Sequence, residues 1–427
     1  MTLFKNTLAF SQEMDRNDSI SSFKELFHFP QHKGENCIYF VGNSLGLQPK
    51  NVNTYLQEVL DDWKNLGVEG HFHSQKPWWD YHERGSESLA KIVGALPSEV
   101  SVMNTLSVNL HLLMVSFYRP TPKKFKIICE HKAFPSDQYL VKSQLRLHGY
   151  TPDEALIEVK PQEGRHYLST QAVLDTLDAH AHETALLFMG GLNYYSGQVL
   201  DMKTITAYAK KLGVFVGWDL AHAAGNVPLQ LHDWGVDFAA WCSYKYMNAG
   251  PGNVSGYYVH EKYHNTADIP RLEGWWGHCK EERFLMKDTF IPEPDAKAWQ
   301  VSNASVMSIA PYWASLEIFE KAGFDNLIRK QKQLTGYLEF VLDAISKKHN
   351  ANFELITPKN PKERGSQISV YLHGYGKSVF DHLIQNGVYL DWREPNVIRL
   401  APVPLYNSFE DVFRFGEILS EGLDNTH

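Results

Sequence analysis

Two residues with chemically useful side chains each come after an apolar stretch of the chain. Asp219 directly follows residues 214–218, and Lys245 follows residues 238–242 at a short distance. A lysine amine can form a Schiff base with an aldehyde, and a carboxylate can keep a pyridinium nitrogen protonated. The spacing of the two residues fits successive strands of one α/β sheet. Together they predict a site for pyridoxal phosphate.

The neighbours of this pair favour the same chemistry but leave simpler explanations open. Lys245 lies between Tyr244 and Tyr246, and a lysine desolvated beside phenols loses its proton more readily, as Schiff-base chemistry requires. An arbitrary lysine is nevertheless usually a surface residue, and Asp219 could be a helix N-cap, with His222 on the same helix face. A metal at Asp219 and His222 would need further ligands, and none is obvious, so we predict no metal site.

Two other segments could complete such a site. Residues 103–111 precede a helical run, and hydroxyls and free N–H groups at the start of a helix can bind phosphate. Phe134 follows an apolar stretch at 125–129 and could stack on a pyridine ring. A plain helix cap and a core phenylalanine explain these two features equally well.

Other motifs do not lead to a function. Residues 374–378 resemble a phosphate-binding P-loop, but Tyr371 stands where the first glycine is required. His71 and His73 have no third metal ligand nearby in the sequence. No G-x-G-x-x-G fingerprint follows a predicted strand, which disfavours dinucleotide binding.

The middle of the chain alternates between apolar, strand-like pieces and helical pieces. We expect strands at 125–129, 185–189, 214–218, 238–242 and 256–259, and helices at 136–147 and 201–212. Continuous apolar strands separated by helices are typical of a parallel sheet covered on both faces. Ligands bind such sheets beyond the carboxyl ends of the strands, which is where Asp219 lies.

A passage rich in proline and glycine, residues 269–294, interrupts this alternation. After it we expect helices at 307–321, 324–347 and 378–385, and strands at 367–372 and 397–400. The pattern predicts an α/β fold with three parts. These are an N-terminal segment (1–50) that packs on the small domain, a large cofactor-binding domain (51–309) and a smaller C-terminal α/β domain (310–427).

Composition narrows the class of protein. The 427 residues are 43% hydrophobic and 21% charged, which fits a globular protein of two or three domains. The formal net charge is −8 with no basic block, so nucleic acid is not an expected partner. The four cysteines form no CxxC pair, which argues against disulfides and structural zinc. No stretch resembles a signal peptide or a membrane span, so we expect a cytoplasmic enzyme without membrane association.

Longer stretches of the chain resemble the kynureninase family, whose members are pyridoxal-phosphate enzymes of the aspartate aminotransferase fold, or fold type I. The resemblance extends over nearly the whole chain and is carried by residues 39–49, 103–113, 132–137, 219–222, 232–238, 243–246, 274–275 and 401–406. Many long stretches in the right order are more specific than any single motif. The resemblance implies a large domain with a mainly parallel, seven-stranded sheet.

The resemblance also implies roles for individual residues. Lys245 resembles the lysine that binds the cofactor and catalyses the reaction, and Asp219 resembles the partner of the ring nitrogen. The other cofactor-binding positions that it implies are Leu106, Ser107, Phe134, Ser136, Asp137, His222, Tyr244, Trp275 and Asn303. The substrate-binding positions are Ser44, His71, Ser302, Asn303 and Arg399, with Arg399 binding the substrate carboxylate.

The resemblance also implies an assembly of two subunits, and at one position this chain differs from some members of the family. Trp275 and Asn303 match positions that reach the site from a neighbouring subunit, which implies a homodimer with shared active sites. At Gly190, some relatives carry a serine that contacts the cofactor, so any contact from Gly190 must come from its backbone.

The activity implied is hydrolytic Cβ–Cγ cleavage of an amino acid, 3-hydroxykynurenine or kynurenine, in tryptophan catabolism. The products are 3-hydroxyanthranilate or anthranilate, plus alanine. His71, Ser302 and Asn303 match the animal-type enzymes, which favours 3-hydroxykynurenine. The alternatives on the same fold are a cysteine desulfurase and a class V aminotransferase, but no cysteine has a clear catalytic setting. A noncatalytic binding protein would have no need of both Lys245 and Asp219.

Overall fold

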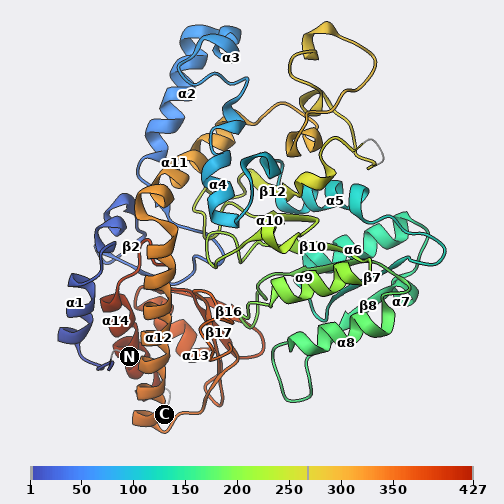
Figure 1. Ribbon diagram of the computed structural model, residues 1–427. Helices are drawn as coiled ribbons and strands as arrows, with labels where there is room; N and C mark the ends of the chain where they lie inside the picture. Colours follow the sequence, from blue (N-terminus) through green and yellow to red (C-terminus); the bar gives the residue numbers. More distant parts are fainter. Residues whose placement is uncertain (1–2, 267–268, 426–427) are drawn as a thin grey trace.

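The structure is a computed structural model that describes residues 3–266 and 269–425. The chain folds around two separate sheets, one large and one small, with the long helix α12 (Phe324–His349) running beside the smaller one (Figure 1). The described ends of the chain lie close to this smaller sheet.

Seven strands form the large sheet in the order β6-β12-β11-β10-β9-β7-β8. Their bounds are β6 (Val100–Met103), β7 (Lys126–Glu130), β8 (Leu156–Val159), β9 (Thr184–Gly190), β10 (Phe215–Asp219), β11 (Phe238–Trp241) and β12 (Ser255–Val259). Strand β12 runs antiparallel to both of its neighbours, and the other pairings are parallel. The prediction of an α/β fold with a mainly parallel, seven-stranded sheet is therefore confirmed.

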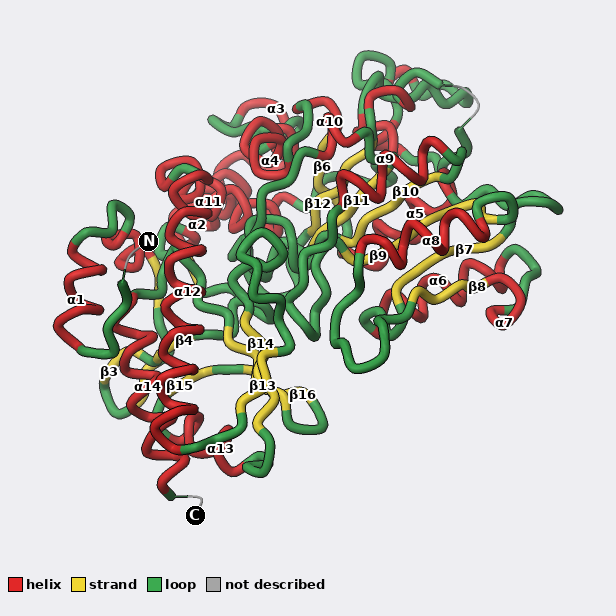
Figure 2. The backbone as a smooth tube through the Cα atoms, turned by 60° about the horizontal axis from the view of Figure 1, so that its bottom comes forward, coloured by secondary structure: helices red, strands yellow, loops and turns green. Residues whose placement is uncertain are grey.

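Helices cover both faces of this sheet because its side chains alternate between two apolar cores (Figure 2). Leu187 and Val216 pack in one core with α8 (Thr170–His180) and α9 (Met202–Lys211). Their strand neighbours pack on the opposite face with α5 (Leu106–Phe117) and α6 (Pro135–Leu147). The five expected strands of this sheet are all present, with ends shifted by a residue at most.

Two strands of the large sheet, β6 and β8, were not expected. Each has only four residues, and β8 is an edge strand whose residues are mostly half-buried. Short strands at the edge of a sheet lack the long apolar run that identifies a central strand.

The small sheet is antiparallel, in the order β13-β14-β17-β16. Its strands are β13 (Phe353–Leu355), β14 (Ile368–Leu372), β16 (Asp391–Arg393) and β17 (Val397–Leu400), and it packs with α12, α13 (Ser378–Gln385) and α14 (Phe409–Asp424). Near the N-terminus, α1 (Leu8–Arg16) packs against α14, and β4 (Ile38–Tyr39) pairs with β15 (Val388–Tyr389). Residues of α11 (Val306–Ala322) pack in the core of the large sheet, while most of α12 packs in that of the small one. The exact domain boundaries remain predictions.

A third group of elements projects from the large sheet. Helix α2 (Val52–Leu66) packs on α11 and leads to α3 (Gly70–His73), near the passage of residues 275–300 in Figure 1. The remaining elements are α4 (Ser86–Val93), α7 (Pro152–Ala155), α10 (Leu231–Trp234), β1 (Phe27–His28), β2 (Gln31–His32), β3 (Glu35–Asn36), β5 (Gln48–Pro49) and eight short 3-10 turns. Among the described residues, no helix has both the length and the apolar character needed to cross a membrane.

Candidate active site

A pocket of about 150 Å³ opens beyond the carboxyl ends of β7, β9 and β10. We call it the central pocket. Nine of the residues expected in the site line it: Leu106, Ser107, Phe134, Ser136, Asp137, Asp219, His222, Tyr244 and Lys245. This is the position at which open α/β sheets bind ligands, because the carboxyl ends of parallel strands and the following helix N-termini meet there.

Lys245 is buried and faces a histidine rather than solvent. Its Nζ lies 3.0 Å from His222 Nε2, and it also lies near the rings of Phe134 (5.8 Å) and Tyr244 (5.9 Å). Burial and the charge of Lys245 hold the pKa of His222 well below its usual range, so this ring is neutral. His222 lies in a turn after β10, so the helix face that it could have shared with Asp219 does not form.

Asp219 and Asp137 form a buried pair of carboxyl groups. Burial raises the pKa of both groups, and in Asp137 the charge of Asp219 raises it further. The two side chains hydrogen-bond to each other, and Asp219 Oδ1 also accepts from the backbone N–H of Ala221 at 2.7 Å. Since no helix starts at Asp219, it is not an N-cap. Two carboxyl groups this close hold one proton between them, and a cationic ring nitrogen beside them would stabilise both in the charged form.

Two helix N-termini converge on the opposite side of the central pocket. Thr105, the N-cap of α5, makes no side-chain capping bond, so the first N–H groups of that helix are left for a ligand. Ser107 of α5 and Ser136 of α6 join the two helices through their hydroxyls, 2.8 Å apart. Free N–H groups and hydroxyls at helix starts bind phosphate.

These features match the parts of pyridoxal phosphate one by one. The pocket holds a lysine for the aldehyde, a carboxyl pair for the ring nitrogen, helix N-termini for the phosphate and an aromatic side chain, Phe134, beside the lysine. His222 Nδ1 is buried and has no hydrogen-bond partner, which a bound polar ligand can supply. The residues of the site therefore fit the cofactor.

Glu130 and Tyr194 are among the pocket residues that were not foreseen. Glu130 is the last residue of β7, directly after a buried apolar run, and Tyr194 follows β9. An acid after an apolar strand is the same signal that identified Asp219, so the sequence does contain a clue to Glu130. Nothing in the sequence singles out Tyr194, whose ring lies 5.2 Å from that of Phe134.

Arg399 lies beneath the central pocket and is already paired. It is 1% exposed, donates to the carbonyl of Tyr194 at 2.6 Å and forms an ion pair with Asp391. Ser44 donates to the same carboxylate at 2.8 Å. Although Ser44 lies in a Gly-x-Ser-x-Gly run, no helix follows it, so it does not form the nucleophile elbow of a hydrolase.

Four other residues expected to bind cofactor or substrate do not line the central pocket: His71, Trp275, Ser302 and Asn303. His71 lies on α3, where its Nδ1 is 3.0 Å from the carbonyl of Val68. Trp275, Ser302 and Asn303 are all exposed. An aromatic cluster links two of these regions, since Phe284 contacts both Phe72 (6.2 Å) and Trp275 (6.1 Å). His71 and Trp275 thus belong to one projecting part of the chain, α3 with residues 275–303, which we call the lobe.

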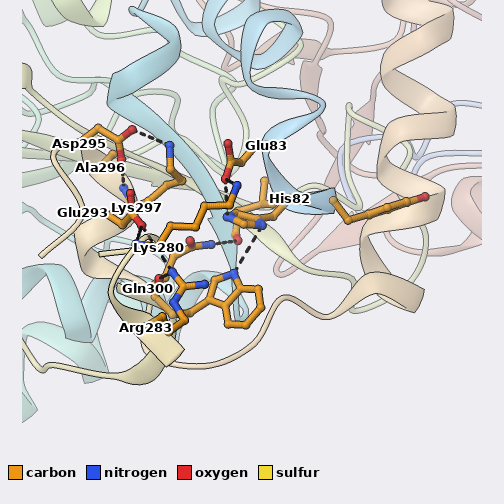
Figure 3. A network of polar contacts seen from close by, with 12 residues as sticks. His82, Glu83, Lys280, Arg283, Glu293, Asp295, Ala296, Lys297 and Gln300 are labelled. Atoms are coloured by element: carbon orange, nitrogen blue, oxygen red, sulfur yellow. Dashed lines mark hydrogen bonds and ion pairs between the residues drawn. The ribbon is translucent and has the colours of Figure 1, made fainter. Parts of the chain in front are cut away.

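A buried polar network holds the lobe to the rest of the molecule (Figure 3). Lys280 pairs with Glu83 at 3.1 Å. Arg283 donates to two backbone carbonyls of the lobe, at 2.8 and 2.9 Å, and lies over the rings of Trp79 and Trp276. Gln300 donates to the backbone of β6 at 3.2 Å. The contacts of Lys280 with Glu83, of Arg283 with Trp79 and of Gln300 with Val102 join residues far apart in the sequence, so the sequence could not reveal them.

Among the described residues, one cluster has the residue types of a metal site. Glu99, His232 and His260 bring a carboxylate oxygen and two nitrogens within 4.8 Å of one another. The cluster lies at the start of β6 and just after the end of β12, at the opposite end of the sheet from the central pocket. Glu99 accepts hydrogen bonds from the backbone N–H groups of Leu96 and Glu261, both at 2.9 Å, so its carboxylate is satisfied without an ion.

Comparison with known proteins identifies the family of the chain. The family model for the kynureninase C-terminal domain matches residues 327–419. The kynureninase of Flavobacterium psychrophilum is 59% identical over 99% of both chains, and that of Myxococcus xanthus is 50% identical over 98% of this chain and 97% of its own. A fungal kynureninase, from Sclerotinia sclerotiorum, is 48% identical over 98% of this chain and 94% of its own.

Solved structures with a similar fold are more distant in sequence. A cysteine desulfurase from Thermococcus onnurineus has a TM-score of 0.75 with 17% identity and covers all of both chains. A mutant of C-DES with glycine covalently linked to its PLP cofactor has a TM-score of 0.74 with 17% identity, over 90% of this chain and 96% of that one. At such identities these structures show the fold alone, whereas the close relatives show the family. The chain belongs to the kynureninase family, and it is a pyridoxal-phosphate-dependent hydrolase of carbon–carbon bonds.

Proposed function

We propose that the enzyme prefers 3-hydroxykynurenine to kynurenine and that it works as a homodimer whose two subunits share each active site. The observation that carries the homodimer is the separation of the site into two surfaces of one chain. The central pocket holds nine of the residues expected to bind the cofactor, while Trp275, Asn303 and the other residues matched to the aromatic end of the substrate lie on the lobe.

The lobe has the character of a surface that contacts another subunit. Its exposed side chains include Phe72 (47% exposed), Phe284 (56%), Leu285 (61%) and Met286 (66%). Apolar side chains gathered on one exposed region are typical of an interface. A second copy of the chain is the partner that would give Trp275 and Asn303 a central pocket to complete.

Each residue of the central pocket has a task that its contacts support. Pyridoxal phosphate, when bound, supplies the aldehyde that takes up the substrate amine and the ring that accepts electrons. Lys245 holds the cofactor and then moves the Cα proton, and its contact with His222 fixes the position of the amine in the pocket. Asp219, with Asp137, keeps the ring nitrogen protonated. Burial raises the pKa of Tyr244, so its phenol stays protonated and can donate a hydrogen bond.

The substrate preference rests on His71, Ser302 and Asn303. An imidazole, a hydroxyl and an amide can hydrogen-bond the ring hydroxyl and amine of 3-hydroxykynurenine. A site built to hydrogen-bond a hydroxyl discriminates strongly against the analogue that lacks it, because its polar groups are then left unpaired.

Steady-state kinetics of the purified enzyme with both kynurenines test this proposal. We expect a higher kcat/KM for 3-hydroxykynurenine, and we expect Asn303→Ala to reduce that preference with little effect on cofactor absorbance. Equal kcat/KM values for the two substrates would contradict the preference. Lys245→Ala is the control for the chemistry, and it should have no turnover with either substrate.

The desulfurase alternative lacks a suitable thiol. Such an enzyme needs a nucleophilic cysteine with a lowered pKa. Cys242 lines the central pocket, but burial raises its pKa to about 11. Cys279, on the lobe, is hydrogen-bonded to Glu281, which raises its pKa as well. Both thiols are therefore protonated near neutral pH, and cysteine is an expected non-substrate in the same assay.

A further inference from the structure

Glu130 is a buried carboxyl group in the wall between two cavities. It is 4% exposed and lies at the end of β7, where it lines the central pocket together with Asp219 and Lys245. It also lines a larger, more open cavity of about 730 Å³, whose other walls include His166 and Arg393. Glu130 therefore lies where solvent from the outer cavity can meet the central pocket.

The position of this carboxyl group is fixed by neighbours on the loop after β9. Its Oε2 accepts from the side-chain amide of Asn193 at 3.0 Å, and the backbone N–H of Gly190 donates to the same carboxyl group. A Cβ at position 190 would lie 3.0 Å from Glu130 Oε1, which is closer than ordinary contact. The glycine that departs from the serine of some relatives thus leaves room for Glu130.

The reaction consumes a water molecule, and the other titratable groups of the central pocket are poorly suited to take its proton. Asp219 and Asp137 are the partners of the ring nitrogen, so their carboxyl groups are already engaged. The phenol of Tyr244 and the thiol of Cys242 both stay protonated near neutral pH. Burial and the charge of Lys245 hold the pKa of His222 well below its usual range, so its ring is a weak base. Burial, with a smaller contribution from the charge of Asp219, raises the pKa of Glu130 to about 7, which is suited to proton transfer near neutral pH.

We propose that Glu130 is the general base that activates the water for carbon–carbon bond hydrolysis. This inference rests on the proposed function of the site. In the step, an O–H bond of water breaks and its proton goes to the Glu130 carboxylate. The oxygen forms a bond to the substrate ketone carbon, and the π electron pair of the carbonyl moves onto the ketone oxygen.

The test separates this step from the earlier ones by comparing Glu130→Gln with the unmodified holoenzyme. Lys245 removes the Cα proton without Glu130, so Glu130→Gln should still exchange the substrate Cα hydrogen with deuterium from D₂O, measured by NMR. The affinity of the apoenzyme for pyridoxal phosphate, measured by fluorescence titration, should also stay within about twofold. Cleavage to anthranilates should fall about 10²–10⁴-fold, the usual contribution of a general base.

A pH profile gives the second readout. In the unmodified enzyme, kcat for cleavage should fall as the pH decreases through about 7, because Glu130 becomes protonated. Asn193→Ala removes a hydrogen bond that lowers the pKa of Glu130, so this acidic limb should move to higher pH. Glu130→Asp keeps a carboxylate and should recover part of the activity lost in Glu130→Gln.

Two results would overturn the inference. One is cleavage by Glu130→Gln within tenfold of the unmodified enzyme. The other is a loss of cleavage, Cα exchange and cofactor affinity in parallel, which would mean that Glu130 only supports the pocket. An unmodified enzyme that cleaves neither kynurenine would instead contradict the proposed function, so the two failures are distinguishable.

Discussion

At the scale of single residues, the arginine expected to bind the substrate already has an ion-pair partner, whereas the residues around Lys245 leave groups free for the cofactor. Arg399 cannot meet a substrate carboxylate freely, because Asp391 already pairs with it and also accepts from Ser44 and Arg393. A carboxylate that binds Arg399 has to replace Asp391 or share the guanidinium with it. If the substrate carboxylate binds Arg399, as we expect, binding rearranges this network, and the measured affinity reflects the difference between two ion pairs.

The first prediction concerns the replacement of Asp391 by a substrate carboxylate at Arg399. Arg399→Lys should raise KM roughly 10- to 100-fold, because lysine cannot form the bidentate contact of arginine and a hydrogen bond to a charged group contributes about 1.5–3 kcal/mol. Cofactor absorbance should not change, since Arg399 does not line the central pocket. Arg393→Lys is the matched control, because Arg393 pairs with the same carboxylate but is partly exposed, whereas Arg399 is buried. Similar KM values in the two variants would argue against a special role for Arg399.

At the scale of elements, the network that holds the lobe contains a buried histidine whose contribution to stability depends on pH. His82 is 3% exposed beneath Trp276, and burial, with the nearby charges of Lys297, Lys280 and Arg283, lowers its pKa from 6.5 to about 3. Between these two pH values the unfolded chain binds more protons than the folded one. The contribution of neutral His82 to stability is therefore complete above about 6.5 and is lost as the pH falls below that value.

The second prediction follows from this loss of stability at low pH. Lowering the pH from 7.5 to 5 should destabilise the enzyme, and His82→Asn should reduce the size of that loss. The loss should also appear as faster hydrogen exchange of residues 276–300, measured by mass spectrometry. His73→Asn provides the control, because the His73 side chain is 70% exposed and has only an exposed partner, Glu69. If the pH dependence of stability were the same in His82→Asn, His82 would not be its cause.

The elements and the central pocket could largely be predicted from the sequence, whereas the lobe could not. Apolar runs identified the central strands, and the positions after them identified Asp219 and Lys245, because strand ends determine where side chains meet. The roles of the lobe residues came only from family resemblance. Their positions depend on contacts such as Arg283 over Trp276, which join residues by side-chain packing without a periodic pattern. The pairing of Arg399 with Asp391 is of the same kind.

At the scale of the whole molecule, the proposed dimer would bring together residues that lie apart in one chain. The central pocket and the lobe are each held by their own packing, yet His71 and Trp275 do not line the pocket of their own chain. In a symmetric dimer, the same surface of each subunit meets its counterpart, so each lobe can complete the other subunit's pocket. Such a site needs two intact contributions, one from each subunit.

Mixing two inactive variants tests this arrangement directly. Lys245→Ala removes the lysine of the central pocket, and a double replacement, Trp275→Ala with Asn303→Ala, removes the lobe residues, so each pure variant should be nearly inactive. After the two are unfolded and refolded together, half of the dimers carry one chain of each kind. One of the two sites in such a dimer has both an intact pocket and an intact lobe, so about a quarter of the unmodified activity should return, as expected for random pairing in a two-fold dimer. If the lobe served the pocket of its own chain instead, every site would lack one contribution and mixing would restore nothing. Analytical sedimentation of the refolded mixture, and of each variant refolded alone, checks that dimers have formed. A lack of activity in the mixture then cannot be due to subunits that failed to pair.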